Sequence, residues 1–280
     1  MKKYTILILI LFVGLNFLAQ HNDNEPLEVF SEKDAEGNTV VYAKNNYWCD
    51  ESLIIEFRIL KNMQVDVDLP FQTVVPPQTK KIKLFTISLI KSNKESSMSF
   101  VSASCHGNIF KEDYSSSETY LLPYQKGKTY RLDQGYGGKF SHYMANKQYA
   151  LDFNLPLGTP IAASRSGVVV NVKDNDSKHG KTIKFINYGN YITIYHSDGT
   201  FADYFHIQKE GSKVKVGDKV LAGQVIALSG STGWTSGPHL HFQVYIYSEN
   251  MNVKTIKTQF LQEDGKLIYL KEKENYTAYH

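Results

Sequence analysis

Short runs of apolar and β-branched residues, separated by polar turns, extend through almost the whole chain. In the first half they include Thr39–Tyr42, Leu53–Phe57 and Lys81–Ile87, with clusters of Asn, Asp, Ser and Pro between them. Runs of this length bounded by turn residues are typical of β-strands. Several of them at such intervals predict a β-sandwich of immunoglobulin-like architecture, an accessory domain that we place at residues 21–125.

The strand-like pattern resumes after residues 126–138, a Gly-rich and polar stretch that we interpret as a linker and entry loop. The later runs are Ile161–Val172, Thr182–Ile186, Tyr191–Tyr195, Val214–Leu228 (with breaks) and Leu240–Tyr247. No segment longer than about ten residues has the 3.6-residue apolar period of an amphipathic helix. The expected fold class is therefore all-β, with a second β domain at residues 126–250 and a C-terminal strand extension at residues 251–280.

The first 20 residues have a different composition from the rest. Lys2 and Lys3 precede an apolar run, Ile6–Leu18, that is shorter than the roughly 20 residues of a transmembrane helix. A basic segment followed by such a run predicts a secretory signal peptide at residues 1–20. An uncleaved anchor is the alternative, because Phe17 occupies a position where a small residue is expected before cleavage. We expect an exported protein, periplasmic or extracellular, without a stable membrane span once the signal is removed.

Charge and cysteine content narrow the class of protein. The formal net charge is +3, and removal of the two signal-peptide lysines leaves +3 − 2 = +1. A nucleic-acid-binding protein needs a concentrated basic face, so we expect no nucleic-acid partner. The two cysteines, Cys49 and Cys105, would form one disulfide in an oxidising compartment or remain as two buried thiols. His106 beside Cys105 is interpreted as structural, and the first half is assigned no chemical role.

Histidines and one aspartate in the second half stand at the ends of expected strands. His239 and His241 flank Leu240 in an HxH pattern, and residues two apart on a strand point to the same face. His142 precedes Asp152 and its apolar neighbours, while His206 ends a third strand. Two imidazoles and one carboxylate with an open fourth position form a typical catalytic zinc set. The alternative is that all of these side chains are hydrogen-bonded residues of the core or surface.

The order and spacing of these residues resemble the lysostaphin/LytM family of zinc endopeptidases. The resemblance covers roughly residues 135–247 and includes the connecting segments Leu157–Ala163, Gly167–Val169, Gly217–Val220 and Gly223–Ile226. It implies a small two-sheet antiparallel β domain with a metal in a groove on one sheet. It also implies one Zn²⁺ per chain, bound by His142, Asp152 and His241, with His206 and His239 as the catalytic pair.

The resemblance implies an exported zinc metalloendopeptidase that hydrolyses peptide bonds in peptidoglycan, in stem-peptide cross-links or bridges. There is no HExxH motif, so the proton transfers would fall to His206 and His239. Tyr204, two residues before His206, could share its face and is a candidate substrate contact; since Tyr is abundant in this chain, packing in the core is the favoured alternative. The alternative function is a catalytically inactive LytM-like module that binds or regulates envelope components.

One departure from the family pattern affects the metal site. Many members place the first two ligands as HxxxD, whereas nine residues separate His142 from Asp152 in this chain. We therefore expect the intervening segment, Tyr143–Tyr149, to loop out along the rim of the cleft.

Overall fold

The computed structural model of this chain describes residues 8–11, 27–111, 114, 118–139 and 141–279. They form two compact units, Met1–Phe110 and Lys111–His280. Both units consist of β-strands, and the described helices are two short 3-10 turns, η1 (Ala145–Lys147) and η2 (Ile183–Tyr188). The all-β prediction is confirmed. No helix within the described ranges is long and apolar enough to cross a membrane.

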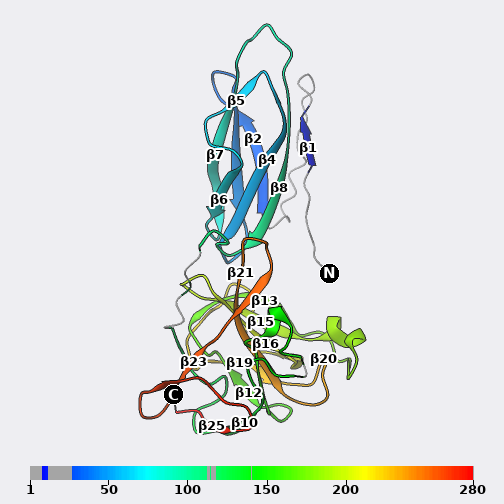
Figure 1. Cartoon of the computed structure of the whole chain (residues 1–280), viewed down its shortest axis with the longest axis vertical. Helices are drawn as coiled ribbons and strands as arrows, with labels where there is room; N and C mark the ends of the chain where they lie inside the picture. Colours follow the sequence, from blue (N-terminus) through cyan, green and yellow to red (C-terminus); the bar gives the residue numbers. More distant parts are fainter. Residues whose placement is uncertain (1–7, 12–26, 112–113, 115–117, 140, 280) are drawn as a thin grey trace. The chain divides into compact units, whose positions relative to one another are not determined.

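The first unit is a sandwich of two four-stranded antiparallel sheets (Figure 1). The strands of one sheet, in order, are β1 (Ile8–Leu11), β8 (Ser97–His106), β4 (Glu51–Lys61) and β6 (Phe71–Val75). The strands of the other are β2 (Leu27–Lys33), β3 (Thr39–Asn45), β7 (Thr79–Leu89) and β5 (Met63–Val65). The expected signal segment lies outside the described residues, except for the four residues of β1. The immunoglobulin-like assignment remains a prediction.

The core of the first unit lies between these two sheets. Alternate residues of facing strands supply it, including Val41 and Ala43 of β3, Leu53 and Ile55 of β4, and Phe85 of β7. The three runs predicted in this half therefore correspond to β3, β4 and β7. Cys49 and Cys105 are both free thiols, but only Cys49 is buried and Cys105 is partly exposed, so the alternative of two buried thiols holds in part.

The second unit is built on a nine-stranded sheet that smaller sheets accompany (Figure 1). Its strands, in order, are β18 (Lys219–Val220), β13 (Gly167–Lys173), β15 (Tyr191–Tyr195), β16 (Phe201–Phe205), β21 (Leu240–Tyr247), β11 (Leu151–Phe153), β10 (Thr129–Gln134) and β25 (Asn275–Thr277), with β22 (Val253–Ile256) also paired to β21. The smaller sheets contain β12 (Pro160–Ala162), β19 (Val225–Ser229) and β17 (Ile207–Ser212); β14 (His179–Gly180) and β20 (Gly233–Trp234); and β24 (Leu267–Ile268), β23 (Gln259–Leu261) and β9 (Thr119–Tyr120).

Alternation along β21 divides the second unit into a core side and a polar side. Leu240, Phe242 and Val244 belong to the hydrophobic core. His241 and Gln243, between them, point to the opposite face, because successive side chains of a strand alternate. The central strand of the large sheet thus presents polar side chains on the face away from the core.

Two sequence expectations were wrong. Residues 182–186 do not form a strand: Ile183–Tyr188 is the 3-10 turn η2, and Ile183 and Ile186 are 54% and 48% exposed. Apolar side chains predicted a strand here, but no sheet edge is paired with the segment. The expected linker at residues 126–138 contains β10, which pairs with β11 and β25 and buries Leu132 completely.

The boundary between the compact units falls at Phe110/Lys111, upstream of the expected division at residues 125/126. Tyr120, Leu122 and Tyr124 belong to the hydrophobic core of the second unit. The C-terminal extension also belongs to that unit, since β25 pairs with β10 and Phe260 is completely buried in the same core.

Candidate functional site

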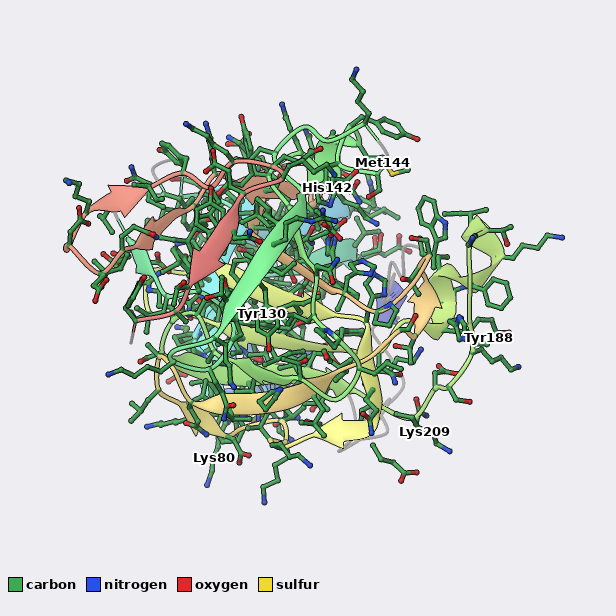
Figure 2. All side chains as sticks on the ribbon, turned by 90° about the horizontal axis from the view of Figure 1, so that it is seen from below. Lys80, Tyr130, His142, Met144, Tyr188 and Lys209 are labelled. Carbon is green, nitrogen blue, oxygen red and sulfur yellow. The ribbon has the colours of Figure 1, made fainter. Side chains whose placement is uncertain are left out.

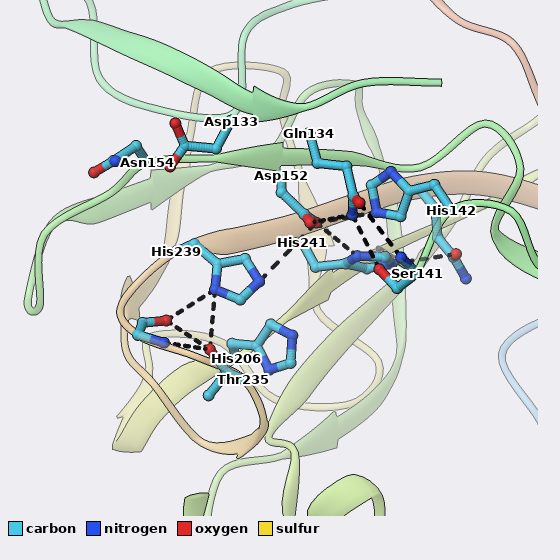
Figure 3. A network of polar contacts seen from close by, with 12 residues as sticks. Asp133, Gln134, Ser141, His142, Asp152, Asn154, His206, Thr235, His239 and His241 are labelled. Carbon is cyan, nitrogen blue, oxygen red and sulfur yellow. Dashed lines mark hydrogen bonds and ion pairs between the residues drawn. The ribbon is translucent and has the colours of Figure 1, made fainter. Parts of the chain in front are cut away.

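Three neighbouring strands bring the candidate metal ligands together on the polar face of the large sheet. Asp152 of β11 lies directly opposite His241 of β21, and Gln134 of β10 lies opposite Asp152 on the other side. The alternation that buries Leu240 and Phe242 therefore also places the imidazole of His241 beside the carboxylate. His142 reaches the same point from the loop that follows β10 (Figure 3).

The candidate ligand atoms lie close to one another. Asp152 Oδ1 is 2.9 Å from His241 Nδ1 and 3.2 Å from His142 Nε2. One atom from each of the three residues lies within 4.8 Å of the others. His142 is completely buried, and Asp152 and His241 are only 9% and 5% exposed. Such a cluster of two nitrogens and one oxygen, almost out of contact with solvent, has the composition of a catalytic zinc site.

Hydrogen bonds orient the two imidazoles. His142 Nδ1 is 2.9 Å from the carbonyl oxygen of Gly135, and since that oxygen only accepts, Nδ1 donates. The remaining nitrogen, His142 Nε2, is buried and has no hydrogen-bond partner among the described residues. His241 Nδ1 is 2.9 Å from Asp152 Oδ1 and its Nε2 is 3.4 Å from Gln243 Oε1; with a metal in the cluster, donation from Nε2 to Gln243 would leave the Nδ1 lone pair for the metal. An orphaned buried nitrogen beside a carboxylate fits a divalent cation.

The charge states of Asp152 and His241 are also suited to metal binding. Burial by itself would raise the pKa of Asp152, but the imidazoles of His142 and His241 hold that pKa well below its usual range. Burial lowers the pKa of His241, and the neighbouring carboxylate only partly opposes this. The site therefore presents an ionised carboxylate and a neutral imidazole, the forms in which these groups bind metals.

His206 and His239 lie beside the cluster, with their rings close together and tilted by 46°. Their ring centroids are 4.5 Å apart, and His239 Nε2 is 4.0 Å from Asp152 Oδ1 (Figure 3). His206 Nδ1 donates to Thr232 O at 2.7 Å, and His239 Nδ1 donates to Gly237 O at 2.9 Å. Each ring therefore keeps its Nε2 as a potential proton acceptor. Burial, together with His239 and His241, lowers the pKa of His206 well below its usual value, so that His206 is neutral at pH 7.

Tyr204 does not reach the groove, and the prediction that it contacts substrate is not retained. Its side chain is completely buried in the core, where the Ser164 amide donates to its hydroxyl at 2.8 Å. The expectation assumed that Tyr204 and His206 share one face of a strand. His206 has a φ of 66°, and β16 ends at Phe205, so the alternation stops before the histidine.

The cluster lies in a groove with a volume of about 1190 Å³. Its lining includes the turn after β10, the loop from Trp234 to His239 and the polar face of β16 and β21. The segment Tyr143–Tyr149 loops out as expected and contains η1. Met144 lies at the surface beside the buried His142 (Figure 2), while Lys147 reaches the groove and its Nζ is 5.5 Å from the Trp234 ring.

Several polar residues of the site were not identified from the sequence. Gln134 Nε2 donates to Asp152 Oδ2 at 2.9 Å, and Gln243 connects His241 to Asp203, to which its Nε2 donates at 3.3 Å. Asp203 is almost buried; burial raises its pKa to about 6, although the hydrogen bonds from Thr193, Gln243 and Tyr245 oppose the rise. Gln243 stands two residues after His241, so the alternation that relates His239 to His241 could have identified it.

Comparison with known proteins supports the interpretation of the second unit. The sequence matches Peptidase family M23 over residues 146–253, a range that includes Asp152, His206, His239 and His241 and begins after His142. Glycyl-glycine endopeptidase ALE-1 of Staphylococcus capitis is 35% identical over 152 residues, 53% of this chain and 37% of that protein. Lysostaphin of Staphylococcus simulans is 36% identical over 137 residues, 49% of this chain and 26% of that protein.

A third relative matches a longer segment. Peptidoglycan DD-endopeptidase ShyA of Vibrio cholerae is 28% identical over 192 residues, 67% of this chain and 41% of that protein. This chain thus spans less than half the length of each of these relatives. Among solved structures, the catalytic domain of S. simulans lysostaphin is similar over 46% of this chain and 87% of that chain, with 32% identity and a TM-score of 0.31.

Proposed function

Since this chain contains a peptidase domain of family M23, we propose that it is a zinc metalloendopeptidase that hydrolyses peptide bonds in peptidoglycan. The relatives named as glycyl-glycine and peptidoglycan DD-endopeptidases support this substrate class. The groove, larger than the pockets that usually enclose a small molecule, suits a polymeric substrate with an extended peptide.

The convergence of His142, Asp152 and His241 is the observation that carries the proposal. We assign these residues as ligands of one Zn²⁺, because the buried His142 Nε2 has no hydrogen-bond partner in the described part of the chain and lies 3.2 Å from an ionised carboxylate. Bound zinc would supply Lewis-acid activation of the scissile carbonyl and of a water molecule.

His206 and His239 are proposed as the residues that handle the proton and the developing charge. Both hold their Nδ1 proton on a backbone carbonyl, so both Nε2 atoms are acceptors in the neutral form. The depressed pKa of His206 keeps it neutral and able to take up a proton at pH 7. His239 Nε2 is 4.0 Å from Asp152 Oδ1 and, once protonated, could donate to the oxyanion or the leaving amine.

Digestion of purified peptidoglycan, followed by mass spectrometry of the soluble fragments, tests this function. The wild-type chain should release peptide-cleaved fragments, whereas Asp152→Ala should release none and bind no zinc at this site. Asp264→Ala is a matched control, because Asp264 lies in an exposed turn between β23 and β24. A folded, zinc-loaded wild-type chain that leaves every peptide bond intact would instead support the inactive binding module.

Export is part of the proposal, because peptidoglycan lies outside the cytoplasmic membrane. Lys2, Lys3 and the apolar run Ile6–Leu18 are the sequence features that support it. Mass spectrometry of the protein recovered from the cell envelope should find an N-terminus near residue 20. Recovery of the intact chain from the cytoplasmic fraction alone would contradict export.

A further inference from the structure

A second cluster of metal-binding side chains lies in the first unit, far along the chain from the groove residues. Cys49 precedes β4, Glu51 is the first residue of β4, and His106 is the last residue of β8. The three residues contribute a thiol, a carboxylate and an imidazole whose ligand atoms all lie within 4.8 Å of one another. These three donor types together are typical ligands of zinc.

The cluster is concealed from solvent on one side and accessible on the other. Cys49 and Glu51 are 1% and 2% exposed, whereas the side chain of His106 is 35% exposed. Cys49 Sγ is 3.7 Å from Glu51 Oε1, and His106 Nδ1 is in hydrogen-bond contact with the same oxygen. A cation at this point would have buried ligands behind it and a path to water past the imidazole.

The surrounding backbone holds the three residues in place. Gly107 N donates to Asp50 O at 2.7 Å, and the Ser52 hydroxyl donates to Gly107 O at 2.7 Å, so the start of β4 is tied to the end of β8. Asn45 Nδ2 donates to Cys49 O at 3.0 Å. The His106 ring also packs edge-on against Tyr47, with centroids 4.5 Å apart. Ligands held in this way lose little conformational freedom on binding a metal.

The buried carboxylate of Glu51 contacts one imidazole, that of His106, as its only potential cation among the described residues. Within the described part of the chain, Glu51 has contacts with Cys49 and His106 but no ion pair with a lysine or arginine. Placing an ionised carboxylate in the interior is costly unless a positive charge accompanies it. A divalent cation would supply that charge and would also bind the thiolate.

We propose that Cys49, Glu51 and His106 form a second zinc site, which fastens the start of β4 to the end of β8. Binding to the folded state alone stabilises the first unit. The site does not depend on the proposed peptidase function, because none of its ligands lies in the second unit. It differs from the groove cluster in one respect that can be measured, since it alone contains a thiolate.

Metal content of the full chain tests the stoichiometry. The wild-type protein, purified with zinc and desalted, should contain two zinc ions per chain. Asp152→Ala should contain one, His106→Ala should contain one, and the double variant should contain none. Two ions in His106→Ala would overturn the second site, whereas two ions in Asp152→Ala would overturn the groove assignment, so the two failures are distinguishable.

Cobalt substitution tests the ligand identity. Apo wild-type chain loaded with Co²⁺ should show a near-ultraviolet thiolate-to-cobalt charge-transfer band, which Asp152→Ala should retain. Cys49→Ser should lose the band, and Glu51→Gln should weaken cobalt binding at this site at least tenfold. Cys105→Ser is the matched control and should keep the band. Absence of the band in the wild type, or its loss in Cys105→Ser but not in Cys49→Ser, would refute the proposal.

Discussion

Replacement of Gln243 by Met should weaken zinc binding at the groove site about tenfold without unfolding the second unit. With zinc bound, Gln243 Oε1 would accept from His241 Nε2 and so leave the Nδ1 lone pair for the metal. Loss of such an outer partner typically lowers metal affinity 10- to 100-fold. Because the 3.4 Å distance exceeds the usual range for an N–H···O bond, we expect the lower limit, about 1.4 kcal/mol. Met has nearly the volume of Gln, so the packing changes little.

The affinity can be measured by competition between the apo chain and a chromophoric zinc chelator. A Cys49→Ser background removes the proposed second site from the titration. Tyr245→Phe is the matched control: it removes another donor to Asp203, at 3.3 Å, but leaves the contact between Gln243 and His241 intact. This control should bind zinc within about twofold of the parent. The reasoning is refuted if Gln243→Met binds zinc as tightly as the parent, or if Tyr245→Phe weakens binding equally.

Three further predictions concern catalysis, pH and the domain boundary. His206→Ala and His239→Ala should keep groove zinc but slow peptidoglycan cleavage by roughly a hundredfold or more; unchanged turnover would remove that residue from the mechanism. Burial lowers the pKa of His196 from 6.5 to about 4, so the unfolded chain binds the proton first as pH falls. The contribution of neutral His196 to the free energy of unfolding is fully present above pH 6.5 and should fall by about 3 kcal/mol toward pH 4. Urea titrations at several pH values should show that His196→Gln reduces this pH dependence. A chain that begins at residue 111 should fold and bind zinc in the groove. A chain that begins at residue 126 lacks the core side chains of Tyr120, Leu122 and Tyr124, so its circular dichroism spectrum should show that it does not fold.

Local pattern was sufficient to predict the strands nearest the site. Tyr191–Tyr195 and Leu240–Tyr247 have the bounds expected from the sequence, because alternation with period two is a property of the segment itself. The same alternation placed His241 on the polar face. It could not apply to Tyr204 and His206, since the positive φ of His206 is a backbone feature that no residue pattern in the segment revealed.

Sheet register and long-range packing decided the rest. Asp152 lies opposite His241 across 89 residues, and His142 reaches both only because an intervening loop folds out of the sheet. The segment at residues 182–186 has the composition of a strand, but no described strand pairs with it, and it forms a 3-10 turn. Cys49, Glu51 and His106 form no recognisable sequence motif, because the histidine is 55 positions after the glutamate. Composition and periodicity act over a few residues and determined the elements, whereas contacts between distant strands determined which polar side chains share a site.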